Sequence, residues 1–160
     1  MTATISQNRS DYGFNTEVRV RLSETDAVGI VYFGSFSTYL DVGRMDYLSH
    51  LALDQQRFAH HAGHIAHLPP GAVASVQLQF HRPARYKDTL LVHVRVAKIG
   101  RTSYTFHMLV TDKRVPQTIA TGELTLVWLD EAFRPAPIPD EFRSAIEAFE
   151  AAQQRSQGNH

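Results

Sequence analysis

Hydrophobic and polar residues alternate in five stretches of the chain, and this period of two predicts five β-strands. The first stretch covers residues 14–23, in which Val18, Val20 and Leu22 share one face. The other four stretches are separated by short connections, which favour antiparallel pairing between neighbours. They cover residues 74–80, 90–96, 104–110 and 120–128.

Between the first and the second strand, the spacing of apolar residues changes to three or four, as in an α-helix. One stripe of a helix over about residues 34–51 consists of Phe36, Leu40, Gly43, Tyr47 and Leu51. A glycine inside a helix costs about 1 kcal/mol relative to alanine. Because Gly43 lies on the apolar stripe, we expect the helix to pass close to the sheet there.

The two ends of the chain differ in character from this middle part. Residues 1–13 are polar and predict a loose, flexible arm. Residues 135–160 predict a proline-rich link, a helix over about residues 141–153 capped by Asp140, and a polar tail. A further short helix is expected over residues 54–61. Residues 14–134 therefore form one α+β domain, a five-stranded antiparallel sheet that wraps around one long helix.

Composition and charge exclude several classes of function. The 16 Lys and Arg residues balance 16 Asp and Glu residues, so the net positive charge that drives non-specific nucleic-acid binding is absent. The chain has no cysteine, which excludes disulfides, thiolate catalysis and cysteine-based zinc sites. No apolar run suits a signal sequence or a membrane span, so we expect a cytoplasmic protein that does not enter a membrane.

Common nucleotide-binding, serine-hydrolase and zinc-protease motifs are absent, and Asp26 stands out as the candidate acid. It follows the first strand in a short loop with Gly29, a few residues before the long helix. Unpaired N–H groups at a helix start can hold an acyl oxygen while a carboxylate attacks the carbonyl carbon or deprotonates water. An aspartate is also common as the cap of a turn or helix, and spacing alone favours that interpretation.

The segment that surrounds Asp26, residues 19–33, reads RVRLSETDAVGIVYF. It resembles the signature of hotdog-fold acyl-CoA thioesterases, in the branch of 4-hydroxybenzoyl-CoA thioesterase and the Tol-Pal-associated thioesterases. That signature reads approximately D-x-D-[AP]-x-G-[IV]-V-[YW]. The resemblance extends to residues 80–90 and 99–104 and spans about residues 17–130. The matching positions of the signature are Asp26, Ala27, Gly29, Ile30, Val31 and Tyr32.

The resemblance implies a role for each matching position. Asp26 is implied as the catalytic carboxylate, acting as nucleophile or as general base on water. The backbone N–H of Phe33 is implied as the donor that polarises the thioester carbonyl, and Tyr32 and Gly29 as residues that shape the loop. The residues implied to bind the acyl group or the coenzyme A phosphates are Phe36, Arg101, Lys98, Arg82, Arg85 and Lys87.

The chain departs from the signature at three positions. Glu24 stands in place of the first aspartate, Val28 in place of a small residue, and Phe33 in place of a histidine or tyrosine. A backbone donor survives any replacement except proline, so these departures affect the subgroup and leave the role implied for Asp26 intact.

The resemblance also implies the partners of the protein. The substrate is an acyl-CoA thioester, and neither a metal nor an organic cofactor is required. Two protomers are expected to join their sheets edge to edge into a homodimer with each active site at the interface. Further pairing of dimers into a homotetramer is common in the family.

Histidine clusters offer the main alternative chemistry. His60, His61, His64 and His67 are spaced as metal ligands on a helix sometimes are. The nearby prolines and glycines predict a loop, so we expect a lid over the substrate and no metal site. The strand histidines, His81, His93 and His107, are expected at the surface or with satisfied hydrogen bonds.

Two other functions are compatible with the same fold. One is a non-catalytic module that binds acyl-CoA. The other is a hotdog dehydratase or hydratase acting on a 3-hydroxyacyl thioester. Enzymes of the second kind pair a histidine with an acid, and no histidine lies within residues 24–33.

Overall fold

The computed structural model describes residues 4–54 and 71–158. The short helix expected over residues 54–61 and the cluster from His60 to His67 therefore lie outside the described residues, apart from Asp54 itself.

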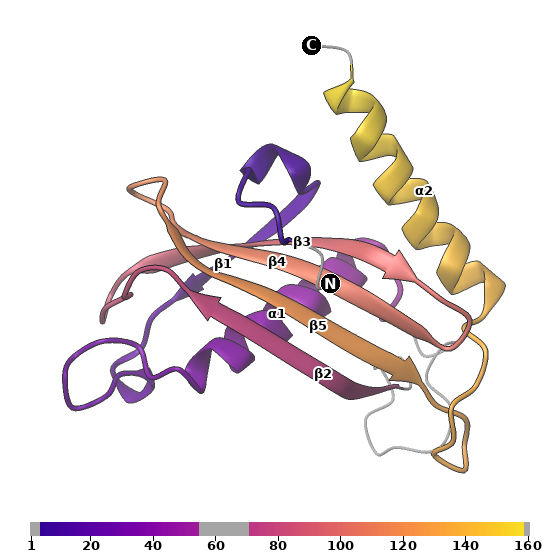
Figure 1. Cartoon of the computed structure of the whole chain (residues 1–160), viewed down its shortest axis with the longest axis horizontal. Helices are drawn as coiled ribbons and strands as arrows, with labels where there is room; N and C mark the ends of the chain where they lie inside the picture. The colour runs from indigo at the N-terminus through magenta and orange to yellow at the C-terminus, as the bar shows by residue number, and fades with distance from the viewer. Residues whose placement is uncertain (1–3, 55–70, 159–160) are drawn as a thin grey trace.

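The core of the protein is one antiparallel sheet of five strands in the order β1-β3-β4-β5-β2 (Figure 1). The prediction of five antiparallel strands around one long helix is therefore confirmed. The strand predicted over residues 14–23 is only partly confirmed. Strand β1 ends at Arg19, and a 3-10 turn, η2 (Leu22–Glu24), follows it. As a result, Leu22 is 66% exposed and does not face the core. The strands are β1 (Phe14–Arg19), β2 (Gly71–Phe80), β3 (Thr89–Ile99), β4 (Ser103–Asp112) and β5 (Thr118–Trp128).

The long helix α1 (Ser35–His50) packs on one face of this sheet. Its predicted apolar stripe is confirmed at Phe36, Leu40, Gly43 and Tyr47, which are all buried. The fifth position, Leu51, is the half-buried residue that follows the helix. Figure 1 shows α1 crossing the sheet obliquely, with its first turns near β2 and β5 and its last turns near β3 and β1. The close approach expected at Gly43 is present. A β-carbon there would lie 2.7 Å from Val92 Cγ1.

The C-terminal helix α2 (Asp140–Gln157) starts one residue before the predicted helix and extends four residues beyond it. The prediction that Asp140 caps it was wrong. Pro139 occupies the cap position without any side-chain hydrogen bond, and Asp140 is the first helical residue. A carboxylate in the first turn still interacts favourably with the positive end of the helix dipole. Phe142 of α2 packs edge-on against Trp128, with ring centroids 4.9 Å apart.

One half-buried carboxylate attaches α2 to both the central helix and the sheet. Glu150 accepts a hydrogen bond from Tyr47 Oη at 2.6 Å and one from the Val96 N–H at 2.9 Å. Burial raises the pKa of Glu150, and the two hydrogen bonds oppose burial only in part. Burial also raises the pKa of the Tyr47 hydroxyl. Tyr47 therefore remains the donor in this contact.

Residues 4–12 lie on the face of the sheet opposite α1. Since Val92 and Val94 face α1, the alternation of the strand directs His93 to this outer face. The Tyr12 ring lies 6.1 Å from the His93 ring, centroid to centroid, and the Arg95 guanidinium lies 5.8 Å from the Tyr12 ring. Burial, with a smaller contribution from Arg9, lowers the pKa of His93 to about 4.

All three histidines predicted on strands have a side-chain partner through Nε2. The expectation of a surface position or satisfied hydrogen bonds is wrong for His107, which is buried and whose Nδ1 has no partner among the described residues. His93 Nε2 lies 3.0 Å from Thr111 Oγ1, and His81 Nε2 lies 3.1 Å from Thr121 Oγ1. His107 Nε2 lies 3.0 Å from a carboxylate oxygen of its cross-strand neighbour on β5. His93 and His107 therefore belong to the polar outer face of the sheet, whereas His81 follows the end of β2.

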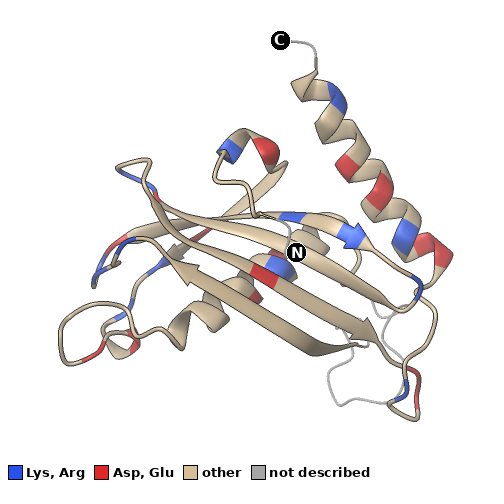
Figure 2. Cartoon of the chain, viewed as in Figure 1, with Lys and Arg blue, Asp and Glu red and all other residues tan. Residues whose placement is uncertain are grey.

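Charged residues are distributed over the strands, loops and helices with both signs interspersed (Figure 2). Within residues 4–54 and 71–158, none of the helices is sufficiently long and apolar to span a bilayer.

The contact at Gly43 can be tested by Gly43→Ala. In an open helix this change would stabilise the protein by about 1 kcal/mol. Here the new methyl group meets Val92 and Val94, so we expect a net loss of about 1–3 kcal/mol in the free energy of urea unfolding. The matched control is Gly158→Ala, because the nearest atoms to a β-carbon there lie 3.8 Å away. A Gly43→Ala protein as stable as the wild type would contradict the close approach.

Candidate functional site

Asp26 lies in a tight loop between η2 and α1. The Asp26 N–H donates to the Ile30 carbonyl at 2.8 Å, and the Gly29 N–H donates to the Asp26 carbonyl at 3.0 Å. Gly29 has a φ of 86°, a conformation that strains residues with a side chain. This agrees with the loop-shaping role implied for Gly29, since the turn requires a glycine at that position.

The two oxygens of the Asp26 carboxylate have different surroundings. Oδ1 accepts a hydrogen bond from the Val28 N–H at 2.8 Å, with a longer contact to the Ile30 N–H at 3.4 Å. Asp26 therefore does cap the turn, as its spacing predicts. Oδ2 has no hydrogen-bond partner among the described residues, and the carboxylate forms no ion pair with them. The residue is exposed to solvent. The cap holds the side chain in place and leaves one oxygen available.

A cavity of about 510 Å³ opens beside this carboxylate. It lies where the Asp26 loop, the start of α1 and the end of β2 meet. The cavity brings together four of the residues named from the sequence: Asp26, Phe33, Phe36 and Arg82. The residues that complete its lining are Ile30, Val31, Phe80, His81, Pro83 and Ala84.

Phe80 is a lining residue that the sequence analysis did not single out. Its ring packs edge-on against Phe36, with centroids 5.1 Å apart. The signal that was available is its place at the end of an alternating strand, directly before a polar loop. That signal becomes informative only once β2 is known to lie beside the start of α1.

Phe33, which lines the cavity, has a backbone N–H that is unpaired among the described residues. Helix α1 begins two residues later, at Ser35, and its first turn is joined to the loop by the bond from the Phe36 N–H to the Phe33 carbonyl at 3.2 Å. Within the described part of the chain, the Phe33 N–H itself has no acceptor. A donor of this kind is suited to hold a developing oxyanion.

Tyr32 supports the loop from outside the cavity. Its ring packs on the Phe33 ring, with centroids 4.6 Å apart, and its N–H donates to the Glu24 carbonyl at 2.9 Å. Tyr32 is exposed and does not line the cavity. Its position agrees with a structural role in the loop.

Glu24 holds the Asp26 loop in place, a contribution that the sequence analysis missed. Its carboxylate accepts hydrogen bonds from the Arg21 N–H and guanidinium and from Tyr39 Oη, the last at 2.7 Å. Burial acts to raise the pKa of Glu24, but these donors and the Arg21 charge outweigh burial and hold it below its usual value. Tyr39 belongs to α1, so Glu24 fastens the Asp26 loop to the central helix.

The loop after β2 lies along the Asp26 loop and carries two more of the predicted basic residues. The Val31 N–H donates to the Ala84 carbonyl at 2.8 Å, and Ile30 forms an isolated bridge with Arg85. Lys87 lies further along, with its ammonium group 5.3 Å from the centre of the Tyr86 ring. Arg82, Arg85 and Lys87 therefore extend from the cavity along one loop.

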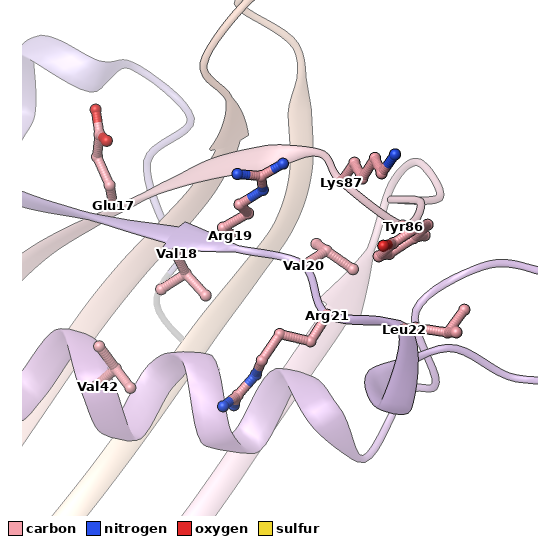
Figure 3. A pocket seen from close by; sticks show the side chains of 9 residues that line it. All are labelled: Glu17, Val18, Arg19, Val20, Arg21, Leu22, Val42, Tyr86 and Lys87. Atoms are coloured by element: carbon pink, nitrogen blue, oxygen red, sulfur yellow. The ribbon is translucent and has the colours of Figure 1, made fainter.

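A second hollow, of about 560 Å³, lies beyond Lys87 at the open edge of β1 (Figure 3). Figure 3 shows Arg19 and Lys87 on one side of the strand and Arg21 directed toward α1. The Arg21 guanidinium is paired with Glu24 at 2.6 Å. Arg19 and Lys87 form no ion pair with the described residues, so this edge remains positively charged.

The structure does not bring Lys98 and Arg101 to Asp26 within one protomer. Both belong to the β3–β4 hairpin, where the Arg101 carbonyl accepts from the Ile138 N–H at 2.8 Å. Strand pairing links this hairpin to the beginning of β2, since Ser103 pairs with Val127 and Gly71 pairs with Trp128. The cavity lies at the other end of β2.

Strand β2 forms an open edge of the sheet that is exposed on both faces. All of its residues except Leu78 are exposed, including Val73, Val76 and Phe80 at 48%, 45% and 47%. An open edge with exposed apolar side chains is a ready template for pairing with another strand. The cavity lies at one end of this edge.

Metal binding finds no support among the described residues. They contain no group of three or more histidine and acidic side chains placed to hold an ion.

Comparison with known proteins adds evidence on ancestry. The model of the Thioesterase-like superfamily matches residues 20–146. The putative esterase sll0410 of Synechocystis is 29% identical over 119 residues, which cover 74% of this chain and 68% of the relative. The acyl-CoA thioesterase YbgC of Haemophilus influenzae is 25% identical over 136 residues, which cover 85% of this chain and 96% of the relative.

Solved structures agree with this relationship. A thioesterase from Thermus thermophilus, crystallised with coenzyme A and zinc, superposes with a TM-score of 0.73 and is 28% identical, covering 88% of this chain and 97% of that chain. The residues that the superfamily model matches, 20–146, contain the Asp26 loop, α1 and all strands from β2 onward. The family resemblance found around Asp26 is confirmed, and the chain belongs to the Thioesterase-like superfamily.

Proposed function

We propose that this protein is a cytoplasmic acyl-CoA thioesterase that hydrolyses an acyl-CoA to a carboxylic acid and free coenzyme A. The observation that carries the proposal is the shared cavity of Asp26 and the Phe33 N–H at the start of α1. A carboxylate and an unpaired amide on two residues that line one apolar hollow can provide both groups needed for attack on a carbonyl.

In the general-base form of the reaction, Asp26 takes a proton from water as the water oxygen bonds to the thioester carbonyl carbon. Charge then accumulates on the carbonyl oxygen, which accepts a hydrogen bond from the Phe33 N–H. One such donor contributes about 3–4 kcal/mol to the transition state. When the carbonyl re-forms, the carbon–sulfur bond breaks, and the leaving thiolate of coenzyme A takes up the proton that Asp26 accepted, which restores the carboxylate.

In the nucleophilic form, Asp26 itself attacks the carbonyl carbon. The thiolate leaves, and a mixed anhydride links the acyl group to the carboxylate. Water then cleaves the anhydride, which releases the acid and restores Asp26. Neither form needs a metal or an organic cofactor.

The lining of the cavity suits the two parts of an acyl-CoA. Phe33, Phe36 and Phe80 give an apolar wall for the acyl group. Arg82 at the wall, followed by Arg85 and Lys87 along the same loop, offers positive charge to phosphates. The coenzyme A in the Thermus thermophilus thioesterase supports the same class of substrate.

A dehydratase or hydratase function is less well supported. His81 is the histidine that lines the described cavity, and its Nε2 is engaged by Thr121 at 3.1 Å. A binding module without catalysis would not require the available Asp26 oxygen and the unpaired Phe33 amide in one cavity. Release of thiol distinguishes the thioesterase from both alternatives.

We also propose that two copies pair through β2. An antiparallel pairing about a two-fold axis places the Gly71 end of one β2 beside the Phe80 end of the other. The β3–β4 hairpin lies at the Gly71 end, so the partner's Arg101 and the partner's Lys98 come to the end of the molecule that carries Asp26. This arrangement accounts for their distance from Asp26 within one chain.

Asp26→Asn tests the catalytic role. The amide neither accepts a proton nor forms an anhydride, so we expect kcat for thiol release to fall by about 10²–10⁴-fold. Asp130→Asn is a matched control because Asp130 Oδ1 also accepts from the N–H groups two and four residues later, but in a loop after β5. Asp130→Asn should keep wild-type turnover. Wild-type turnover in Asp26→Asn would refute the mechanism.

Glu24→Gln tests how the loop is held. Because the folded state lowers the pKa of Glu24, its charge contributes stability above its ordinary pKa of about 4.5, and this stability is lost as the pH falls. We expect the variant to lose about 1–3 kcal/mol at pH 7, where hydrogen bonds to the charged group are lost. Urea unfolding at pH 7 and pH 4 should show a weaker acid dependence than in the wild type.

The control for Glu24→Gln is Glu17→Gln, since the partly exposed Glu17–Lys113 pair is screened by solvent. We expect Glu17→Gln to retain the acid dependence of the wild type. If Glu24→Gln retains it too, the Glu24 charge does not hold the loop.

Val76→Lys tests pairing through β2. A lysine on each copy brings like charges together at the proposed interface, so sedimentation velocity should show a dimer for the wild type and a monomer for the variant. Val115→Lys is the control because Val115 is 49% exposed in the β4–β5 hairpin. A Val76→Lys protein that sediments as a dimer would exclude β2 as the interface.

A further inference from the structure

A smaller hollow of about 330 Å³ lies between α1 and β2, on the same side of the molecule as the Asp26 cavity. Its lining comes from one face of α1, from β2 and from the neighbouring β5. The apolar lining residues are Leu40, Val73, Val76 and Leu124. None of them belongs to the lining of the Asp26 cavity, so the two hollows are separate.

The two hollows are arranged in line along β2. Phe80 at the Asp26 cavity, Leu78, and Val76 at the smaller hollow occupy alternate positions of the strand and share one face. Each step of two residues advances about 6.8 Å along an antiparallel strand. Leu78 therefore stands between the hollows, one step from each.

A glycine on β5 allows Leu40 of α1 to lie close to Leu78 of β2. Gly122 pairs with Leu78 across the strands, and a β-carbon at Gly122 would lie 2.8 Å from Leu40 Cδ1 and 3.4 Å from Leu78 Cδ2. Because the β-carbon is absent, Leu40 of α1 reaches the sheet beside Leu78. Leu40 is buried and Leu78 is half-buried. The side chains of Leu40 and Leu78 therefore lie together over Gly122, between the two hollows.

The line from the Asp26 cavity to the smaller hollow agrees with the direction that an acyl chain must take. The carbonyl carbon is placed near Asp26 and the Phe33 N–H, and the basic loop that follows β2 is suited to the coenzyme A side. The apolar chain then extends away from these charges, between α1 and β2.

We propose that the Leu40–Leu78 contact is the wall that limits the acyl group, so that the wild-type enzyme selects compact acyl groups that end at this wall. The smaller hollow is the continuation of the acyl path, which opens when Leu78 is shortened. This inference rests on the proposed thioesterase function and adds to it a substrate class and a specificity-determining residue.

The experiment compares wild type, Leu78→Ala and Leu78→Phe on benzoyl-CoA and on straight-chain acyl-CoAs from butanoyl to palmitoyl. We expect wild-type kcat/KM to be highest for benzoyl-CoA and short chains. Leu78→Ala should move the optimum to longer chains, with a gain of about fourfold for each further methylene buried. Leu78→Phe should move it to shorter ones.

Gln77→Ala is the matched control, since Gln77 is the neighbour of Leu78 on β2 and the alternation of the strand directs its side chain to the opposite face. Both residues border the hollow beneath the N-terminal arm, so the control also reports on that hollow. It should retain the wild-type chain-length profile. Leu78→Val, a smaller truncation, should give an intermediate shift and replaces Leu78→Ala if that protein does not fold.

Binding separates a failure of this inference from a failure of the proposed function. Calorimetry with the corresponding alkyl-CoA thioethers, which cannot be hydrolysed, measures the chain-length preference without catalysis. If Leu78→Ala and Gln77→Ala show the same profile as the wild type in either assay, Leu78 is not the wall. If no substrate releases thiol but Leu78→Ala shifts thioether binding, the wall stands and the thioesterase proposal fails.

Discussion

The close contact between α1 and the sheet is the constraint on which the rest of this structure depends. It is made possible by two missing side chains, Gly43 on the helix and Gly122 on β5. Because the helix can lie so close at both points, its oblique path is fixed along its whole length. Its first turn therefore reaches the end of β2, where Phe33 and Asp26 meet Phe80.

The two carboxylates that precede α1, Glu24 and Asp26, have different surroundings and different roles. Glu24 is buried, fully engaged by donors and held in its charged form, so it serves as an attachment point. Asp26 is exposed and engaged at only one oxygen. The departure from the family signature at Glu24 is thus compatible with the fold, because the longer side chain reaches both Arg21 and Tyr39.

Much of the fold could be predicted from the sequence because one face of each central strand packs against α1 and imposes strict alternation. The same rule failed at Leu22, where the period continues although the hydrogen bonds between Arg21 and Glu24 turn the chain out of the sheet. Periodicity does not register such a contact between a side chain and the backbone.

The candidate site, like the fold, could be predicted from the sequence only in part. Asp26, Gly29 and Phe33 were named because they lie in one short segment that resembles a family signature; spacing alone favoured a cap for Asp26. Phe80 and Leu78 were not, since their roles depend on which part of α1 lies above β2. Arg101 and Lys98 lie far from Asp26 in one chain, and no pattern within a single sequence indicates what a second copy brings near.

The packing of α2 has a spectroscopic consequence. Trp128 is the one tryptophan in the sequence, and it is buried against Phe142. Intrinsic fluorescence of the protein therefore reports on the junction between α2 and the end of β5. Detachment of this helix exposes the indole to water and shifts its emission to the red, while rearrangement near Asp26, at the other end of the molecule, leaves the signal unchanged.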